Sequence, residues 1–367
     1  MAEKAIRLGG ESTADAIVSA VDAMYTEHTF AEKDFALKHN EDEISVDTNF
    51  AAQNFWKEAL IRFFNKKSAV LGLVLIVVIV LLAVLGPGMN SYTYSGQDLS
   101  QKNFAPRVPG IEQFGILDGS EKMSTTTGTK VTNAYQEKDK PDVYYWFGSD
   151  LYGRDIWTRT WEGARVSLII AVAAAVIDMV IGMSYGLISG YFGGRVDMVM
   201  QRFLEVANGI PRLVIVTLLL LVLQPGMVTI IFALMLTEWV GMSRIARAEM
   251  LKLKDQEFVL ASRTLGAGSF FIIFKEVLPN IIGPIITQVM FSIPTAIFTE
   301  AFLSFVGLGI PVPQCSLGSL ISELYNSFTT HPYQIIPPIV VMSLLMLSFN
   351  LVADGLREAL DPKMKSM

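Results

Sequence analysis

Three carboxylates that lie in or beside strongly apolar stretches are the residues of this sequence best placed to do chemistry. They are Asp178, Glu238 and Glu300. An ionised side chain that faces lipid costs about 3 kcal/mol or more, so each of these must face protein or a water-filled cavity. Two roles are open for each carboxylate: part of the polar wall of a path through a membrane, in contact with a substrate, or a contact between packed helices.

Side chains typical of enzyme active sites are otherwise scarce. The single cysteine, Cys315, excludes an internal disulfide and a paired-cysteine metal site. The histidines, His28, His39 and His331, are too scattered for metal-ligand spacing. Neither G-x-x-x-x-G-K-[ST] nor H-E-x-x-H occurs, which excludes a P-loop and a zinc-protease helix. We therefore expect a non-catalytic chain that holds no metal and no cofactor of its own.

The composition places these residues in a membrane protein. Of 367 residues, 51% are hydrophobic and only 17% are charged, which is too apolar for an ordinary soluble domain. The charge is uneven, because residues 1–56 hold eleven Asp and Glu against four Lys and Arg. Residues 1–48 are therefore predicted to be an acidic cytoplasmic extension, either a loosely attached tail or a contact for a cytoplasmic partner.

An amphipathic helix is predicted to lead from this extension into the membrane. Within residues 49–68, aromatic residues from Phe55 to Phe63 recur at helical spacing, with basic residues around them. Such a mixture suits the lipid headgroups, so this segment is expected to lie on the cytoplasmic surface as an elbow. Residues 69–87 follow as the first span, and the polar residues 88–160 are predicted to be an extracellular loop.

The remaining apolar runs predict five more spans. The runs are residues 166–188, 213–223, 227–237, 281–303, which Pro284 and Pro294 are expected to break, and 335–354. Basic loops stay on the cytoplasmic side, so the turn at residues 224–226 between two of the runs must lie outside. The prediction is six membrane-spanning helices with a core over residues 161–355, a tail over residues 355–367, and both termini in the cytoplasm.

A basic, helix-prone segment, residues 244–283, is too polar to lie in lipid and too short to be a domain. Apolar residues recur at helical spacing up to Leu265, and Gly266 and Gly268 then supply a stop and a turn. A second helix is expected over residues 270–277, ended by the Leu-Pro that follows. This helix–glycine–helix unit is suited to being bound by a partner in the cytoplasm.

The segment resembles the cytoplasmic coupling loop of ATP-binding-cassette importer permeases. The family pattern is Glu-Ala-Ala, three residues, Gly, and later Ile-x-Leu-Pro, which the sequence matches at Ala261, Gly266, Leu278 and Pro279. The sequence departs at three positions, where Leu260 replaces the Glu, Ser262 the second Ala and Glu276 the Ile. The resemblance implies that this unit docks in an ATPase groove through Glu257, Ala261, Ser262, Arg263, Leu265, Gly266 and Gly268.

Three further blocks resemble the C-type permease of oligopeptide and dipeptide importers. The pattern Leu-Gly-Thr-Asp-x-x-Gly-Arg-Asp, then Gly-x-Arg-x-Ser-Leu, is matched at Gly148, Asp150, Gly153, Arg154, Asp155, Gly163, Arg165, Ser167 and Leu168. The pattern Glu-Ala-x-Leu-Ser-Phe-Leu-Gly-Leu-Gly is matched at Glu300, Ala301, Leu303, Ser304, Phe305, Gly307, Leu308 and Gly309. A terminal Gly-Asp-x-Leu-Arg-x-x-Leu-Asp-Pro is matched between Asp354 and Pro362.

The resemblance implies an all-α integral membrane protein with the type I ATP-binding-cassette importer permease fold. It implies the permease subunit of an ATP-driven oligopeptide importer in a bacterial plasma membrane, forming half of the translocation pathway. The implied partners are a second permease, two ATPases that hold ATP and Mg²⁺, an extracellular peptide-binding lipoprotein, the peptide and membrane lipid, with no nucleic acid.

Other functions fit parts of the same sequence. The permease of a dipeptide or nickel importer shares these blocks, and its substrate-binding partner would separate it from an oligopeptide permease. A membrane signalling scaffold that docks through residues 1–48 belongs to another class. Co-purification with a second permease and with ATPases favours the importer, whereas a chain that purifies alone favours the scaffold.

Overall fold

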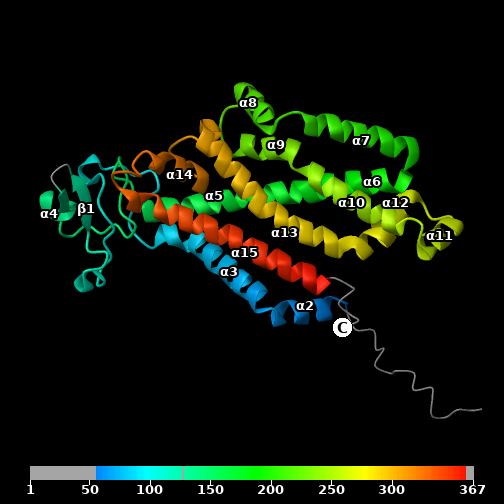
Figure 1. Cartoon of the computed structure of the whole chain (residues 1–367), viewed down its shortest axis with the longest axis horizontal. Coiled ribbons are helices and arrows are strands. Elements are labelled where there is room, and N and C mark those ends of the chain that lie inside the picture. Colours follow the sequence, from blue (N-terminus) through cyan, green and yellow to red (C-terminus); the bar gives the residue numbers. More distant parts are fainter. Residues whose placement is uncertain (1–54, 126–127, 361–367) are drawn as a thin grey trace, which may run out of the picture. The chain divides into compact units, whose positions relative to one another are not determined.

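The computed structural model describes residues 55–125 and 128–360, which belong to one unit of the chain, residues 54–367. The predicted acidic extension, residues 1–48, lies outside the described residues, as do residues 361–367 of the predicted tail. Long helices run side by side through most of this unit, with a β-hairpin at one end and the short helix α11 (Glu257–Thr264) at the other (Figure 1).

The described elements follow the chain in a simple order. The first helices are α2 (Phe55–Asn65), α3 (Lys67–Leu85) and η2 (Gly86–Gly88). The segment that follows contains η3 (Leu99–Gln101), η4 (Glu112–Phe114), β1 (Ser120–Thr125), β2 (Gly128–Asn133) and α4 (Ala134–Glu137). Next come α5 (Ile156–Ile177), η5 (Asp178–Gly182), α6 (Met183–Phe192), α7 (Gly194–Gly209), α8 (Arg212–Val222), α9 (Met227–Thr237) and α10 (Trp239–Leu253). After α11 come α12 (Ser269–Phe271), η6 (Ile272–Val277), α13 (Leu278–Leu303), η7 (Ser304–Leu308), α14 (Leu317–Tyr325), η8 (Pro332–Gln334) and α15 (Ile336–Leu360).

Five helical segments in the described residues are long and apolar enough to cross a membrane. They are Lys67–Gly88, Ile156–Phe192, Met227–Leu253, Ser269–Leu308 and Pro332–Leu360. A sixth candidate is the pair Gly194–Gly209 and Leu213–Val222, which is bent by 79° at its break. If this pair is counted as one span, the described residues hold as many spans as the sequence predicts.

The helix α2 packs on α15 beside the start of α3. Phe63 is buried against Val352 of α15, and Lys66 Nζ lies 2.5 Å from Glu358 Oε1. The opposite side of α2 exposes large apolar side chains, namely Trp56, Leu60, Ile61 and Phe64. One face of this helix therefore holds it to the bundle, and the other presents exposed apolar side chains suited to a membrane surface.

The short apolar runs predicted as the third and fourth spans are extended by their neighbours. The helix α9 continues through Glu238 into α10, so that span reaches Leu253. The helix α8 instead follows α7 across a sharp bend. Ile210 has extended backbone angles (φ −85°, ψ 124°), as expected for a residue that precedes a proline, so α7 ends there.

The prolines of the fifth span do not interrupt it, which corrects two predictions. The helix expected over residues 270–277 does not end at Leu278-Pro279 but runs through η6 directly into α13. Pro284 and Pro294 lie inside the unbroken α13. Pro279 falls in the first turn of α13, where a missing N–H is tolerated, and the π-helical turns of η6 precede it. Pro284 and Pro294 can stay inside the helix because neighbouring helices and hydroxyl side chains can satisfy the backbone groups that a proline leaves unpaired.

The helix α5 lies at the centre of the core and contacts α3, α9, α13, α14 and α15. Its buried residues are mostly small, which lets the surrounding helices approach closely. They include Ala164, Ala171, Ala174 and Ala175. Larger apolar side chains from the other helices, among them Ile230, Ile297 and Leu345, fill the space between them.

Three glycines at intervals of four residues bring α6 and its π-helical start against α10. A Cβ at Gly186 would lie 2.1 Å from the carbonyl oxygen of Ser243, and one at Gly182 would lie 2.5 Å from that of Trp239. A Cβ at Gly190 would lie 2.9 Å from Met250 Cβ. This small-residue spacing is typical of closely packed membrane helices, and the sequence analysis overlooked it.

Residues 88–125 and 128–155, within the segment predicted as an extracellular loop, form a small folded region. The strands β1 and β2 pair antiparallel, from Ser120 with Asn133 to Thr125 with Gly128. The prediction of an all-α chain is therefore wrong here, because threonine-rich segments favour strands even when they are too polar to be buried. Phe104, Tyr135 and Tyr145 form the core of this region.

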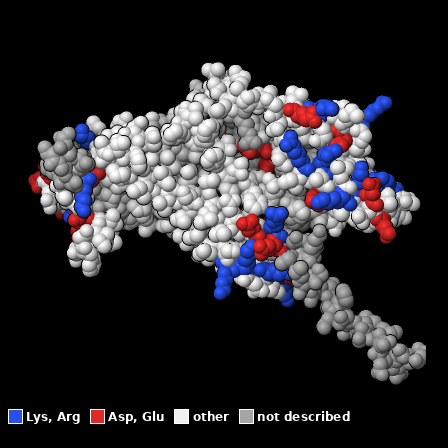
Figure 2. All heavy atoms as spheres, viewed as in Figure 1, with Lys and Arg blue, Asp and Glu red and all other residues white. Residues whose placement is uncertain are grey.

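Charged side chains avoid the middle of the helical bundle. On the face drawn in Figure 2, they gather at the end that carries α11 and around α2, with a smaller group at the hairpin end. Between these groups is an almost uncharged band in which acidic atoms appear in one place. This distribution is typical of a protein that crosses a membrane.

Candidate coupling surface and membrane carboxylates

The helix α11 ends in a left-handed turn at Gly266. The Gly266 N–H donates to the carbonyl of Arg263 at 3.1 Å, and the Ala267 N–H donates to that of Ser262 at 3.0 Å. With Gly266 at φ +84°, these bonds form a Schellman C-cap. The predicted short helix with a glycine stop is confirmed, and the stop requires a residue that adopts this conformation easily.

Contacts from three neighbouring elements fix α11 to the bundle. Val259 is completely buried in an apolar cluster with Met250 of α10 and Ile272 of η6. The Arg263 guanidinium lies 5.3 Å from the centre of the Tyr191 ring of α6. Ser262 Oγ donates to Glu276 Oε1 of η6 at 2.6 Å. The short helix is therefore held from below by α6, α10 and the start of the fifth span.

The outer side of α11 is apolar and exposed. Leu265 is 87% exposed, and the other large apolar side chains nearby are also exposed, namely Phe258, Leu260, Phe270 and Phe271. A Cβ at Gly266 or Gly268 would meet nothing within 4 Å. Apolar groups around a flat, open turn are typical of a surface that another protein covers.

The seven residues predicted for docking lie together on α11 and the turn that follows it. Glu257, Ala261, Arg263, Leu265, Gly266 and Gly268 are exposed. Ser262 differs, because it is only partly exposed and its hydroxyl bonds inward to Glu276. Six of the seven are therefore accessible to a partner, and Ser262 joins the helix to the protein behind it.

Two of the three predicted carboxylates meet the same face of α13. Asp178, at the start of η5, is buried and accepts a hydrogen bond from Ser292 Oγ. Glu238, between α9 and α10, is partly exposed and lies 3.5 Å from Thr299 Oγ1. Ser292 and Thr299 are seven residues apart, which is two helical turns. The sequence analysis missed these hydroxyls, although their spacing was a usable signal.

Glu300 stands apart from this pair. Its side chain is 1% exposed and accepts hydrogen bonds from Ser167 at 3.2 Å, Ser304 at 2.7 Å and Ser316 at 2.5 Å. Ser167 lies on α5, and Ser316 caps the N-terminus of α14. This carboxylate thus joins three helical segments, and its oxygens are occupied by protein groups.

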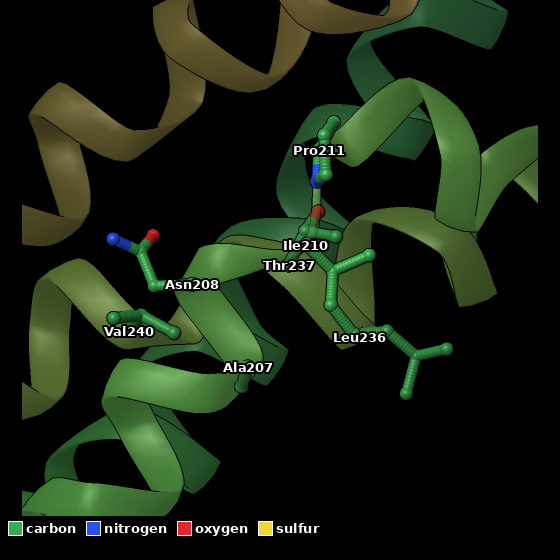
Figure 3. Close-up of a pocket in the computed structure, with 7 residues that line it drawn as sticks. All are labelled: Ala207, Asn208, Ile210, Pro211, Leu236, Thr237 and Val240. Atoms are coloured by element: carbon green, nitrogen blue, oxygen red, sulfur yellow. The ribbon is translucent and has the colours of Figure 1, made fainter.

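A cavity of about 200 Å³ lies at the bend between α7 and α8. Figure 3 shows Asn208, Ile210 and Pro211 from the bend, with Leu236 and Thr237 from the opposing α9. The lining is completed by Ala207 and Val240. The lining residues Thr237 and Val240 lie on either side of Glu238 in the sequence, but Glu238 itself does not line the cavity.

The motif before α5 builds a buried network of ion pairs. Asp150 Oδ2 lies 2.6 Å from Arg154 Nε and 2.9 Å from Arg159 Nη1. Glu323 of α14 pairs with both arginines, at 2.7 Å from Arg159. Burial raises the pKa of Glu323, but the charges of Arg159 and Arg154 outweigh it and hold the pKa below its ordinary value.

The same motif caps the central helix. Asp155 accepts hydrogen bonds from the Thr158 N–H at 2.8 Å and from Asn90 Nδ2 at 2.7 Å. A carboxylate in this position satisfies an otherwise unpaired N–H of the first helical turn. The conspicuous Asp, Gly and Arg residues of the motif therefore fix the folded region between the first two spans to α5 and α14.

These features define a multi-pass helical membrane protein with a short, exposed helix at its charged end. A family model described as binding-protein-dependent transport system inner membrane component matches residues 182–366. A second, the N-terminal TM domain of oligopeptide transport permease C, matches residues 54–106. The chain belongs to the family of binding-protein-dependent transport system inner membrane components.

Curated relatives match most of the chain. The oligopeptide transport system permease protein OppC of Bacillus subtilis is 41% identical over 312 residues, which cover 85% of this chain and 91% of the relative. The dipeptide transport system permease protein DppC of the same organism is 38% identical, with 90% and 93% covered. The DppC protein of Lactococcus lactis is 42% identical, with 85% and 92% covered.

Proposed function

We propose that this protein is the C-type permease subunit of an ATP-driven importer of peptides. It forms half of the path through a bacterial plasma membrane with a second permease, and a peptide-binding protein delivers substrate at the hairpin end. Two ATPases dock at the end that carries α11, which the positive-inside rule assigns to the cytoplasm. The relatives named for oligopeptide and dipeptide transport support the substrate class.

The observation that carries the proposal is the construction of α11. Its outer side presents Leu265 and neighbouring apolar groups, while Val259 and Arg263 hold it to the bundle. A helix of this kind can bind a partner on its exposed side and pass the partner's movement to the bundle through its buried side. The rest of the molecule supports the same role, because α10 and α13 both lead from α11 toward the membrane carboxylates.

The two helices behind α11 give a physical route for coupling. The helix α10 begins next to Glu238 and ends shortly before α11, and its length is about 22 Å. The fifth span carries Glu276 near α11 and both Ser292 and Thr299 farther along. A displacement of α11 by an ATPase therefore reaches both sides of the contacts that hold the carboxylates.

Asp178 and Glu238 are the groups we assign to the wall of the path. Both lie where the bundle is otherwise apolar, and both face hydroxyls of one helix. Carboxylates and hydroxyls together attract the ammonium and amide groups of a peptide without fixing its side chains. Glu300 is instead assigned to packing, since serine hydroxyls occupy its oxygens.

The test is reconstitution of the complex in proteoliposomes, with peptide uptake and peptide-dependent ATP hydrolysis as readouts. Leu265→Arg is expected to reduce co-purification of the ATPases at least tenfold, because it places a charge on the apolar docking surface. Leu99→Arg, at another exposed leucine in the region between the first two spans (66% exposed), should leave it unchanged. Normal co-purification and uptake with Leu265→Arg would overturn the docking role.

Substrate competition separates the peptide importer from its alternatives. Peptides of two to six residues and Ni²⁺ are compared for uptake by the same complex. We expect the oligopeptides to be taken up and Ni²⁺ to be excluded. Uptake of dipeptides alone, or of Ni²⁺ alone, would reassign the substrate, and a chain that purifies without ATPases would favour a scaffold.

A further inference from the structure

Two departures from the family's coupling-loop pattern meet in space. Ser262 stands where the pattern has its second Ala, and Glu276 stands where it has Ile. They are separated by fourteen residues, and Ser262 Oγ donates to Glu276 Oε1 at 2.6 Å. The family pattern has two apolar residues at these positions, whereas this chain has a hydrogen-bonded polar pair.

The environment makes this hydrogen bond costly to lose. Glu276 Oε2 is shut off from solvent and has no hydrogen-bond partner within the described part of the chain. Ser262 therefore provides the hydrogen bond that the structure shows for this carboxylate. Glu276 as a whole is only partly buried, but loss of the Ser262 hydroxyl would leave the carboxylate without this hydrogen bond while Oε2 stays desolvated.

The position of Glu276 allows the contact to link the movement of α11 to that of the fifth span. It lies in the π-helix η6, directly before α13, and its carbonyl accepts a hydrogen bond from Asn280 Nδ2 at 2.6 Å. Val259 holds α11 by apolar packing, which permits sliding, whereas a short directional hydrogen bond fixes its register against the spanning helix.

We infer that Ser262 and Glu276 form a latch that sets the position of α11 relative to α13 and so determines how completely ATPase movement becomes transport. Both are positioning residues. The inference rests on the proposed coupling role of α11 and deepens it. It assigns the latch to the efficiency of coupling, separately from the docking surface that Leu265 provides.

The test is a double-mutant cycle in the reconstituted complex, read as peptide molecules taken up per ATP hydrolysed. Ser262→Ala is expected to lower this ratio about three- to tenfold, in the range of coupling between contacting residues, while the ATPases still co-purify. Ser262→Thr keeps the hydroxyl and should retain most of the ratio. Ser262→Ala with Glu276→Ile restores the apolar pair of the family pattern and should recover it.

A matched control lies on the same helix. Thr264 donates its hydroxyl to the carbonyl of Leu260 within α11, so Thr264→Ala should leave the ratio unchanged. Effects of Ser262→Ala and Glu276→Ile that simply multiply in the double variant would overturn the latch, even if Ser262→Ala assembled poorly. A wild-type complex without peptide-dependent ATP hydrolysis would instead overturn the proposed function.

Discussion

Arg159 Nη1 lies 2.9 Å from Asp150 Oδ2, although both side chains are almost completely shielded from solvent. Asp150 belongs to the folded region between the first two spans, and Arg159 to the first turns of α5. Glu323 brings α14 into the same network. The network thus joins the folded region and the start of α5, which are neighbours in the sequence, to the distant α14, through ion pairs in which Asp150 and Arg159 have almost no access to water.

Removal of one charge from this network should be strongly destabilising. Asp150→Asn leaves Arg154 and Arg159 facing a single carboxylate, and breaking a buried pair costs about 3–5 kcal/mol. We expect a clear loss of thermal stability of the detergent-purified protein. Glu205→Gln alters a highly exposed pair with Arg202 and should change stability by less than about 0.5 kcal/mol. Equal melting of both variants would contradict the structural role.

The Glu323 carboxylate should make the hairpin end of the bundle sensitive to acid. Its pKa is lowered in the folded protein, so its contribution is present above the ordinary pKa of glutamate. That contribution is lost as the pH falls through the lower folded value, from about pH 4 downward. Melting temperature measured between pH 3 and 7 should fall less steeply for Glu323→Gln than for the wild type. Parallel curves would show that Glu323 does not contribute.

The glycines between α6 and α10 should tolerate no side chain. Gly186→Leu would force apart two backbones, because even a Cβ there would lie 2.1 Å from a carbonyl oxygen. We expect the variant to accumulate at less than about a tenth of the wild-type level in membranes, as judged by quantitative immunoblotting. Gly241→Ala on α10 is the control, since its Cβ would meet nothing within 4 Å. Normal levels of the Gly186→Leu protein would show that the helices are not this close.

The turn after α11 should depend on backbone conformation rather than space. At Gly266, φ is +84° and the surroundings are open, so Gly266→Ala introduces strain of about 1–2 kcal/mol. Peptide uptake should fall several-fold with normal membrane levels, and Gly266→Asn should retain more activity, because asparagine adopts this conformation more easily. Gly241 of α10 has no positive φ and its Cβ would also meet nothing within 4 Å, so Gly241→Ala is the control. Identical uptake by the alanine and asparagine variants at Gly266 would contradict this explanation.

Glu300 should behave as a packing residue and the other two carboxylates as path residues. Glu300→Ala strands hydroxyls from α5 and α14, so we expect destabilisation of about 2 kcal/mol or more in a melting experiment. Asp178→Asn combined with Glu238→Gln should instead keep the melting temperature within a few degrees and change relative uptake of cationic and neutral peptides. An unchanged peptide preference would remove both from the path.

Local patterns in the sequence predicted the features that depend on nearby residues alone. The apolar runs gave the spans, and the glycine after a short periodic segment gave the end of α11. The continuation of α9 into α10 depends on how helices pack, which an apolar run does not reveal. The bend at Ile210 instead follows from the proline after it, a local signal that was not used. The polar hairpin was misjudged as a loop, since its strands are not distinguished by buried residues.

Contacts between distant residues were beyond prediction for a different reason. Glu300 looks like Asp178 in sequence, as both are single carboxylates in apolar surroundings, and only the arrival of Ser316 from α14 separates their roles. The bond between Ser262 and Glu276 likewise requires the chain to turn at Gly266 and come back. Neither residue of such a pair predicts the contact when it is read alone in the sequence.

The glycine contacts of the second span imply that tolerance to substitution differs between the faces of this helical segment. The face that carries Gly182, Gly186 and Gly190 meets backbone, so almost every substitution there should be purged. Ile169, Val172, Val176 and Val180 are each about half exposed and can be exchanged for other apolar residues. In a saturation mutagenesis scan of this span, the effect of substitutions on fitness should rise and fall with the helical period. The face with the largest effects would identify the side on which α10 packs.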